Sequence, residues 1–301
     1  MIENKKYKPV IDSEFWQVAG VPDLGEKYNT DERQPVDFGI WQAADGTWQI
    51  WSCIRFCNCG ERRRLLYGWE AQNITDSDWK PLGIRMEADV TLGETSGGLQ
   101  APFVTKKEGL YYMLYGDWNR ICIATSEDGK NFERFMYDKE KGHVLFQGPY
   151  TNTRDCCVIQ VDGLYYCYYT GHVKNQWPQS AVFLRTSKDL LNWSQPTAVN
   201  YGGIAATKAD WFGGDSECPY VVPFKGQYIL FRNQIYVSAN LNHQYCSHNP
   251  VDFGCDNDNY LTGSMEITAP EIVFYNNEYY MASLMPKLNG IRICKIKFEE
   301  I

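Results

Sequence analysis

The chain has 301 residues, 44% of them hydrophobic and 15% aromatic, which is enough to bury a large core. Its net charge of −8 argues against a nucleic-acid partner, because such proteins present a basic face to phosphate groups. No apolar run approaches membrane-spanning length, and the segment MIENKKYKPV at the N-terminus lacks the apolar core of a signal peptide. We therefore expect no nucleic-acid and no membrane partner.

From residue 35 onward the chain repeats an apolar strand, a tight turn and a second, aromatic strand. The five copies are DFGIWQAADGTWQIWSC from Asp37, APFVTKKEGLYYMLYGD from Ala101, DCCVIQVDGLYYCYYTG from Asp155, ECPYVVPFKGQYILFR from Glu217 and APEIVFYNNEYYMASL from Ala269. Val, Ile, Tyr, Phe and Trp favour strands, and Asp-Gly or Glu-Gly pairs between such strands favour hairpins. Each copy therefore predicts a β-hairpin.

The copies recur about every 58 residues, a period typical of solenoids, propellers and arrays. A shorter strand, a polar turn and an aromatic residue complete the unit, as in ICIATSEDGKNFERF (Ile121 to Phe135) and FLRTSKDLLNWSQP (Phe183 to Pro196). Four strands in each of five units predict an all-β fold, a five-bladed β-propeller with four antiparallel strands per blade. A linear β-solenoid is the alternative, but its rungs are shorter than this period. We expect residues 1–34 to close or wrap the ring and residues 35–301 to form a single catalytic domain.

Three acidic residues open copies of the repeated hairpin. Asp37 and Glu217 lie nine residues before their turn residue and Asp155 lies eight before its own, whereas the other two copies have neutral residues there. A single Asp in such a place is more often a turn or capping group than a catalyst. Equivalent positions in a closed repeat converge in space, so three carboxylates should meet at one spot. This arrangement suits acid–base catalysis.

Aromatic, amide and cationic side chains are expected around these carboxylates, because the loop after each second strand returns to the same face. Rings can stack on apolar sugar faces, and charged groups bind hydroxyls strongly. Arg154, directly before Asp155, should also favour the ionised form of that aspartate. The candidate substrate-binding residues are Arg154, Gln100, Trp118, His172, Arg232 and Trp41.

The eleven cysteines do not form a disulfide pattern. Their number is odd, Cys156 and Cys157 are adjacent, and Cys122, Cys167 and Cys294 lie among apolar strand residues, as buried free thiols do. Reduced thiols favour a cytoplasmic protein, although a periplasmic or secreted protein already trimmed of its signal would look the same. Cys57 and Cys59 form a C-x-C with no second pair at zinc spacing, so we expect no metal and no cofactor.

The order of these motifs resembles two families of five-bladed propeller glycosidases, the invertase and fructanase family (family 32) and the arabinanase and xylosidase family (family 43). SECPYVV (Ser216 to Val222) is similar to the Glu-Cys-Pro motif of family 32, and TRDCCVI (Thr153 to Ile159) to its Arg-Asp-Pro, with Cys156 in place of proline. LQAPFV (Leu99 to Val104) resembles the Trp-Ala-Pro of family 43. The Asn-Asp-Pro-Asn-Gly of the invertases is absent around Asp37.

The resemblance implies a glycoside hydrolase that cleaves a terminal furanoside or pentose-type bond of an oligo- or polysaccharide. It makes Glu217 the general acid, Asp37 the nucleophile or the base, and Asp155 the group that stabilises the transition state or raises the pKa of Glu217. A glycoside phosphorylase is the second interpretation, with Arg55, Arg154, Arg232 and Lys287 as candidate phosphate ligands. A non-catalytic carbohydrate-binding propeller is the third, although a binding protein has no reason to keep a cluster of repelling charges.

Overall fold

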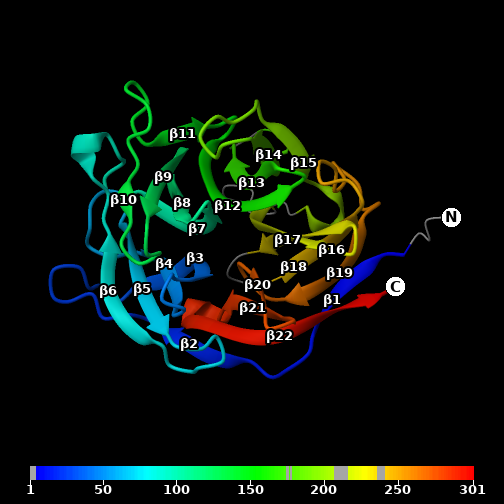
Figure 1. The fold of residues 1–301 in the computed structure, drawn as a ribbon, viewed down its shortest axis with the longest axis horizontal. Coiled ribbons are helices and arrows are strands. Elements are labelled where there is room, and N and C mark those ends of the chain that lie inside the picture. Colours follow the sequence, from blue (N-terminus) through cyan, green and yellow to red (C-terminus); the bar gives the residue numbers. More distant parts are fainter. Residues whose placement is uncertain (1–4, 174–175, 177, 207–215, 236–240) are drawn as a thin grey trace.

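Five antiparallel β-sheets surround a central axis in the computed structural model, which describes residues 5–173, 176, 178–206, 216–235 and 241–301 (Figure 1). Within these ranges the first strands of successive sheets contact one another around the axis. We number the sheets as blades 1 to 5 in the order of these inner strands. The predicted five-bladed, all-β propeller is confirmed.

Blades 1, 3 and 4 have the predicted four strands each. Blade 1 consists of β3 (Gln34–Gln42), β4 (Trp48–Arg55), β5 (Arg64–Ala71) and β6 (Lys80–Met86). Blade 3 consists of β12 (Thr151–Val161), β13 (Leu164–His172), β14 (Ser180–Ser187) and β15 (Thr197–Asn200). Blade 4 consists of β16 (Glu217–Phe224), β17 (Gln227–Ile235), β18 (Leu241–Ser247) and β19 (Leu261–Glu266).

Blades 2 and 5 each have a fifth strand. Blade 2 consists of β7 (Leu99–Lys107), β8 (Leu110–Asp117), β9 (Arg120–Ser126) and β10 (Glu133–Arg134), and β11 (Val144–Gln147) also pairs with β9. Blade 5 consists of β20 (Glu271–Tyr275), β21 (Glu278–Leu284) and β22 (Gly290–Glu300), together with β1 (Tyr7–Ile11) and β2 (Trp16–Gly20), which both pair with β22. The two ends of the chain therefore meet in blade 5, which joins them by backbone hydrogen bonds.

The inner hairpins of blades 2 to 5 have two-residue turns. Both turn residues have a positive φ, for example 51° at Glu108 and 90° at Gly109, and 50° at Asn276 and 62° at Asn277. This is the geometry of a type I′ turn, which Gly and Asn adopt most easily. Blade 1 differs, because Gln42 pairs with Trp48 and leaves a five-residue connection over residues 43–47. That longer turn shifts the numbering of blade 1 relative to the other blades.

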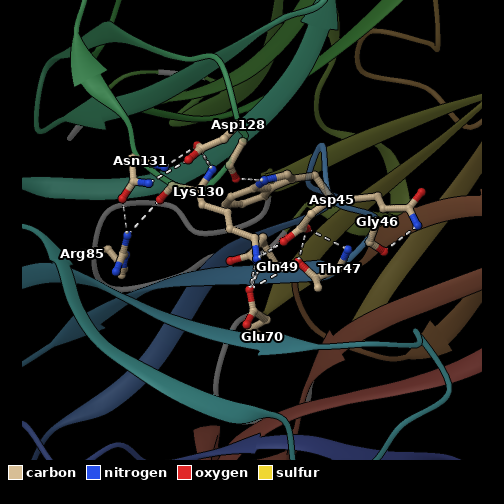
Figure 2. Close-up of polar contacts among 12 residues, drawn as sticks. Asp45, Gly46, Thr47, Gln49, Glu70, Arg85, Asp128, Lys130 and Asn131 are labelled. Carbon is tan, nitrogen blue, oxygen red and sulfur yellow. Dashed lines mark hydrogen bonds and ion pairs between the residues drawn. The ribbon is translucent and has the colours of Figure 1, made fainter.

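Polar contacts join blade 1 to the turn after β9 in blade 2 (Figure 2). The Lys130 ammonium group lies 2.5 Å from a carboxylate oxygen of Asp45 and 2.5 Å from one of Glu70. In the same place the indole Nε1–H of Trp41 donates to the Gly129 carbonyl over 2.7 Å. Adjacent blades are thus held by a shared cation as well as by apolar packing.

The core is apolar and rich in aromatic residues, with Trp51, Tyr115, Tyr168 and Phe231 fully buried. All eleven cysteines are free; nine are buried, and Cys59 and Cys255 are half-buried. The helices in the described part of the chain are the 3-10 turns η1 (Val90–Leu92), η2 (Gly203–Ala205) and η3 (Pro286–Leu288), none of which could span a membrane.

Candidate active site

A β-bulge interrupts each inner strand of blades 1 to 4, between Val36 and Phe38, Gln100 and Phe103, Arg154 and Cys157, and Glu217 and Tyr220. A bulge bends its strand and redirects a side chain, and bulges are common beside active sites. At this point in blades 2 to 5 one residue has a positive φ, namely 28° at Ala101, 60° at Asp155, 47° at Cys218 and 48° at Ala269. These φ values, unusual for residues other than glycine, mark a strained ring around the axis.

The pairing of the strands shows which residues are equivalent. Asp37 is the unpaired residue of its bulge, and Asp155 is the first of the two unpaired residues in the bulge of β12, so each aspartate directly follows the last paired residue before its bulge. In blade 4 that position belongs to Cys218, and Glu217 lies one residue earlier, in the register of Arg154. Two of the three acidic residues therefore begin the bulge of their blade. The longer turn of blade 1 moves its glycine two residues further from the last strand pair, and its bulge has one unpaired residue fewer, so Asp37 lies one residue further from its glycine than Asp155 does.

Asp37, Asp155 and Cys218 meet at the axis. One carboxylate oxygen of each aspartate and the Cys218 Sγ all lie within 4.8 Å of one another. The Cys218 thiol donates to Oδ1 of Asp37 over 3.5 Å, and the Cys218 backbone N–H donates to Oδ2 of Asp155 over 3.2 Å. This spacing would let the three atoms share a metal ion, and it also places two carboxyl groups against each other.

Arg154 joins the third carboxylate to this pair. Its Nη2 lies 2.6 Å from Oε1 of Glu217, and its Nε lies 3.5 Å from Oδ2 of Asp155. The Nε2 of His172 lies 3.6 Å from the same Glu217 oxygen. The structure thus brings together Asp37, Asp155, Glu217, Arg154 and His172 from the candidate set, on strands of blades 1, 3 and 4.

Burial controls the protonation of this cluster. It raises the pKa of Asp155 to about 7, opposed by Arg154 and assisted by the negative charges of Asp37 and Glu217. Burial likewise raises the pKa of Glu217, again opposed by Arg154. Burial and the Arg154 charge hold the pKa of His172 well below its usual value, so its imidazole is neutral. The expected effect of Arg154 on Asp155 is present, but burial outweighs it.

A fourth carboxyl group, Glu271, was not singled out from the sequence. It lines a cavity of about 20 Å³ on the axis together with Asp37, Asp155 and Cys218, and such a volume holds about one water molecule. Burial, and then the charges of Asp155 and Asp37, raise its pKa well above the usual value, so it is neutral. Its place after Ala269-Pro270, which repeats Ala101-Pro102 and Cys218-Pro219 on the inner strands, is the signal that could have identified it.

Two arginines of blade 1 lie on the same side of the propeller as the cluster. Arg55 donates through Nε and Nη2 to the side-chain oxygen of Gln34, and Arg64 lies over the ring of Trp118, 5.4 Å from its centroid. Both positive charges oppose the rise in the pKa of Glu217. Neither arginine forms an ion pair with a carboxylate among the described residues. The cluster therefore has two positively charged neighbours that form no ion pair with a carboxylate of the described residues.

The remaining candidates lie in different surroundings. Gln100 is fully buried in the register of Arg154, and its Oε1 has no hydrogen-bond partner within the described ranges. Trp118 follows β8 in blade 2 and is half-buried, with the guanidinium groups of Arg62 and Arg64 over its ring. Trp41 and Arg232 are not brought to the cluster. Trp41 packs edge-on against Trp51 near the hairpin turn of blade 1, and Arg232 binds Asn200 and the Gly202 carbonyl between blades.

No family model matches the chain. A β-xylosidase/α-arabinofuranosidase from a compost microbial metagenome superposes with a TM-score of 0.60 at 16% identity, covering 97% of this chain and 95% of that chain. A family 43 enzyme from Xanthomonas citri, complexed with xylose, superposes with a TM-score of 0.61 at 12% identity, covering 93% and 90%. At such identities the likeness concerns the fold.

A sequence match of a different kind comes from a 1,2-β-oligomannan phosphorylase of Thermoanaerobacter sp. (strain X514). It is 30% identical over 89 residues, which is 29% of this chain and 29% of the phosphorylase. The matched region thus covers less than a third of either protein. Taken with the sheet topology, these comparisons show that the chain is a five-bladed β-propeller similar in fold to the family 43 glycoside hydrolases.

Proposed function

We propose that this protein is a glycoside hydrolase that cleaves a terminal furanoside or pentose-type bond by carboxylate catalysis. The observation that carries the proposal is the meeting of Asp37 and Asp155, whose oxygens lie within 4.8 Å, beside an arginine that also holds Glu217. Glycoside cleavage requires one carboxyl group that is neutral near pH 7 and one that is charged. Two neighbouring aspartates at a buried site favour this difference in protonation, because two negative charges there would repel each other.

Asp155 is the proton donor favoured by this geometry. Its pKa is raised to about 7, and its Oδ1 has no hydrogen-bond partner in the described part of the chain, so that oxygen is available to a substrate. Glu217, the acid implied by the sequence motif, instead has its Oε1 in a short ion pair with Arg154. In this assignment Asp155 protonates the leaving oxygen, Asp37 acts as the nucleophile, and Glu217 orients Arg154.

The separation of the two aspartates favours retention of the anomeric configuration. Retaining enzymes place their two carboxyl groups about 5–5.5 Å apart, whereas inverting enzymes need about 6.5–9.5 Å to admit a water molecule. One carboxylate oxygen of Asp37 and one of Asp155 lie within 4.8 Å of each other, which is close to the separation in retaining enzymes. A covalent glycosyl-enzyme on Asp37 follows from this proposal.

Several buried polar atoms near the cluster have unused hydrogen-bonding capacity. Oε1 of Gln100, both ring nitrogens of His172 and Nδ2 of Asn233 have no hydrogen-bond partner among the described residues. Buried polar groups are normally paired, so unpaired ones at one site suit a ligand rich in hydroxyls. The fold neighbours complexed with xylose and xylotriose support a sugar of this size as the substrate.

Phosphorolysis is the second candidate, and a specific observation favours it. Arg55 and Arg64 place positive charge near Glu217 without a carboxylate partner in the described ranges, as a phosphate acceptor would require. The partial match to an oligomannan phosphorylase supports the same reaction class. In this case phosphate replaces water as the acceptor of the glycosyl group.

One experiment separates these reactions. The purified protein is incubated with xylo-, arabino- and manno-oligosaccharides, with and without inorganic phosphate, and the products are identified by NMR. Hydrolysis gives free sugar in both conditions, whereas phosphorolysis gives a sugar 1-phosphate only when phosphate is present. Asp37→Asn should abolish either reaction, and Asp162→Asn, an exposed turn residue of blade 3, should leave it intact. Turnover that persists in Asp37→Asn would overturn the proposal.

A further inference from the structure

The connection between β4 and β5 contains two thiols in contact. Sγ of Cys57 and Sγ of Cys59 lie 3.1 Å apart, in hydrogen-bond contact. Cys57 is fully buried, and its thiol also faces the carbonyl oxygens of Ile54 and Arg63 at 3.4 and 3.3 Å. Cys59 is half-buried and open to solvent. One member of the pair is thus accessible to a reagent, and the other lies directly behind it.

The two thiols differ in acidity. The hydrogen bond from Cys57 lowers the pKa of Cys59, with help from the nearby charge of Arg63, although burial and Glu87 oppose this effect. The hydrogen bond to Cys59, followed by burial, raises the pKa of Cys57. Since the thiolate is the reactive form of cysteine, Cys59 is the nucleophile of the pair. Cys57 remains a protonated thiol.

We propose that Cys57 and Cys59 form a thiol–disulfide exchange site that is oxidised reversibly by a low-molecular-weight disulfide. The Cys59 thiolate attacks one sulfur of the reagent, forms a mixed disulfide and releases one thiolate, which takes up the proton that Cys59 lost on ionising. The Cys57 thiol then attacks the Cys59 sulfur, forms the Cys57–Cys59 disulfide, and passes its proton to the second departing thiolate. The reagent is reduced to two thiols and the protein loses two hydrogens, so the exchange balances.

The geometry distinguishes this pair from the other cysteines. Nine of the eleven are buried, and Cys255 is the other half-buried thiol, with its pKa raised by burial. A disulfide needs an S–S distance of about 2.05 Å, so the contact of 3.1 Å requires the sulfurs to approach by about 1 Å. No third His, Cys, Asp or Glu ligand joins the pair within metal-binding distance among the described residues. Exchange between thiols is therefore the chemistry that this pair supports.

The pair also lies in the connection between Arg55 and Arg64. Residues 56–63 lead from Arg55 to Arg64, and Arg62 within them lies over the Trp118 ring, 4.3 Å from its centroid. The Cys57 backbone N–H donates to the Arg63 carbonyl over 3.1 Å, so the thiol pair and the arginines share one short loop. Oxidation would act on the segment that leads to Arg64, whose positive charge opposes the rise in the pKa of Glu217.

The test uses native protein, oxidised glutathione as the reagent, and mass spectrometry after free thiols are blocked with iodoacetamide. All variants carry Cys255→Ser, which removes the other half-buried thiol. The parent should lose two hydrogens and gain no glutathione, with the disulfide mapped to Cys57 and Cys59. Adding Cys57→Ser should leave one glutathione on Cys59, and adding Cys59→Ser should leave the pair unmodified, because Cys57 is buried. Dithiothreitol should restore the parent mass.

Other outcomes would overturn the proposal. A stable glutathione adduct on the parent would mean that Cys57 does not resolve the mixed disulfide. An adduct on Cys57 in the Cys59→Ser variant would contradict the order of attack, and an unreactive parent would show that the pair is inert. Circular dichroism spectra of each variant check the fold, and the result on the parent stands without the variants.

Discussion

Arg154 and Glu217 form an ion pair between blades 3 and 4, with 2.6 Å between Nη2 and Oε1 and both side chains at most 10% exposed. The Nε2 of His172 also lies 3.6 Å from Oε1 of Glu217. The pair fixes the guanidinium group whose Nε faces Asp155. Glu217 can therefore serve the site by holding Arg154 in place, a role that the sequence motif alone does not suggest.

This relationship predicts a large loss of stability in Glu217→Ala. Removing one partner of a buried ion pair leaves the other charge uncompensated and typically costs about 3–5 kcal/mol. We expect the urea midpoint of Glu217→Ala to fall accordingly. Glu278→Ala is the matched control, because Glu278 pairs with Lys295 on the surface and such pairs contribute about 0–1 kcal/mol. Equal midpoints for the two variants would contradict a buried, charged pair.

The choice of proton donor predicts different responses to the leaving group. If Asp155 is the donor, Asp155→Asn should lose roughly 10²–10⁴-fold in the bond-cleavage step on a natural oligosaccharide. The loss should be far smaller on an aryl glycoside whose acidic phenol leaves without a proton. Glu217→Gln should lose the same factor on both substrates, because it disturbs the position of Arg154. Bond cleavage is followed before the steady state, so that the second step does not mask it.

The pH profile gives an independent check of the same assignment. A donor with a pKa of about 7 makes wild-type activity decline above that pH, and Asp155→Asn should remove the decline. The donor is instead Glu217, as the Glu-Cys-Pro motif implies, if Glu217→Gln removes the decline above pH 7 and lowers the rate of bond cleavage on the natural substrate alone.

The fold could be predicted from the sequence because its signals repeat. Alternating apolar and aromatic strands occur five times, joined by a Gly turn in four copies and by Asn276-Asn277 in the fifth, and each copy reinforces the others. The carboxylates could be found for the same reason. Their register could not, because the five-residue turn of blade 1 and the bulges each add residues that a count from the turn does not detect.

The neighbours of the site were harder to predict. Arg232 is predicted in the loop after its strand but lies within β17, and both Trp41 and Arg232 face the adjacent blade rather than the axis. Glu271 lies six residues before Asn277 and so falls outside the count, whereas Cys218 lies eight residues before Gly226, as Asp155 does before Gly163, but carries no charge to mark it. Side-chain direction at a bulge depends on local backbone angles, which a sequence pattern does not determine.

Phosphorolysis predicts a specific effect of Arg64→Met. Loss of a charged hydrogen bond to the acceptor, worth about 1.5–3 kcal/mol, should raise the KM for phosphate by roughly 10- to 100-fold while the KM for sugar changes little. Arg63→Met is the control, because Arg63 pairs with exposed Glu32. An unchanged KM for phosphate would remove Arg64 from acceptor binding, and product formation independent of phosphate would establish hydrolysis.

The raised pKa of Asp155 predicts how stability depends on pH. The unfolded chain ionises this group near pH 4, whereas the folded protein keeps it protonated up to about pH 7. Between these values the folded state binds more protons, so rising pH lowers the free energy of unfolding, and the loss is complete above pH 7. Three pH units correspond to about 4 kcal/mol at most.

Asp155→Asn cannot ionise and should lack this part of the decline, while Glu271, whose raised pKa acts in the same direction, remains in both proteins. Urea denaturation at several pH values between about 4 and 8 measures the difference between the two curves. Asp162→Asn, in the exposed turn of the same blade, should follow the wild type. If the curves of wild type and Asp155→Asn run parallel, Asp155 ionises as an ordinary aspartate and is no proton donor near neutral pH.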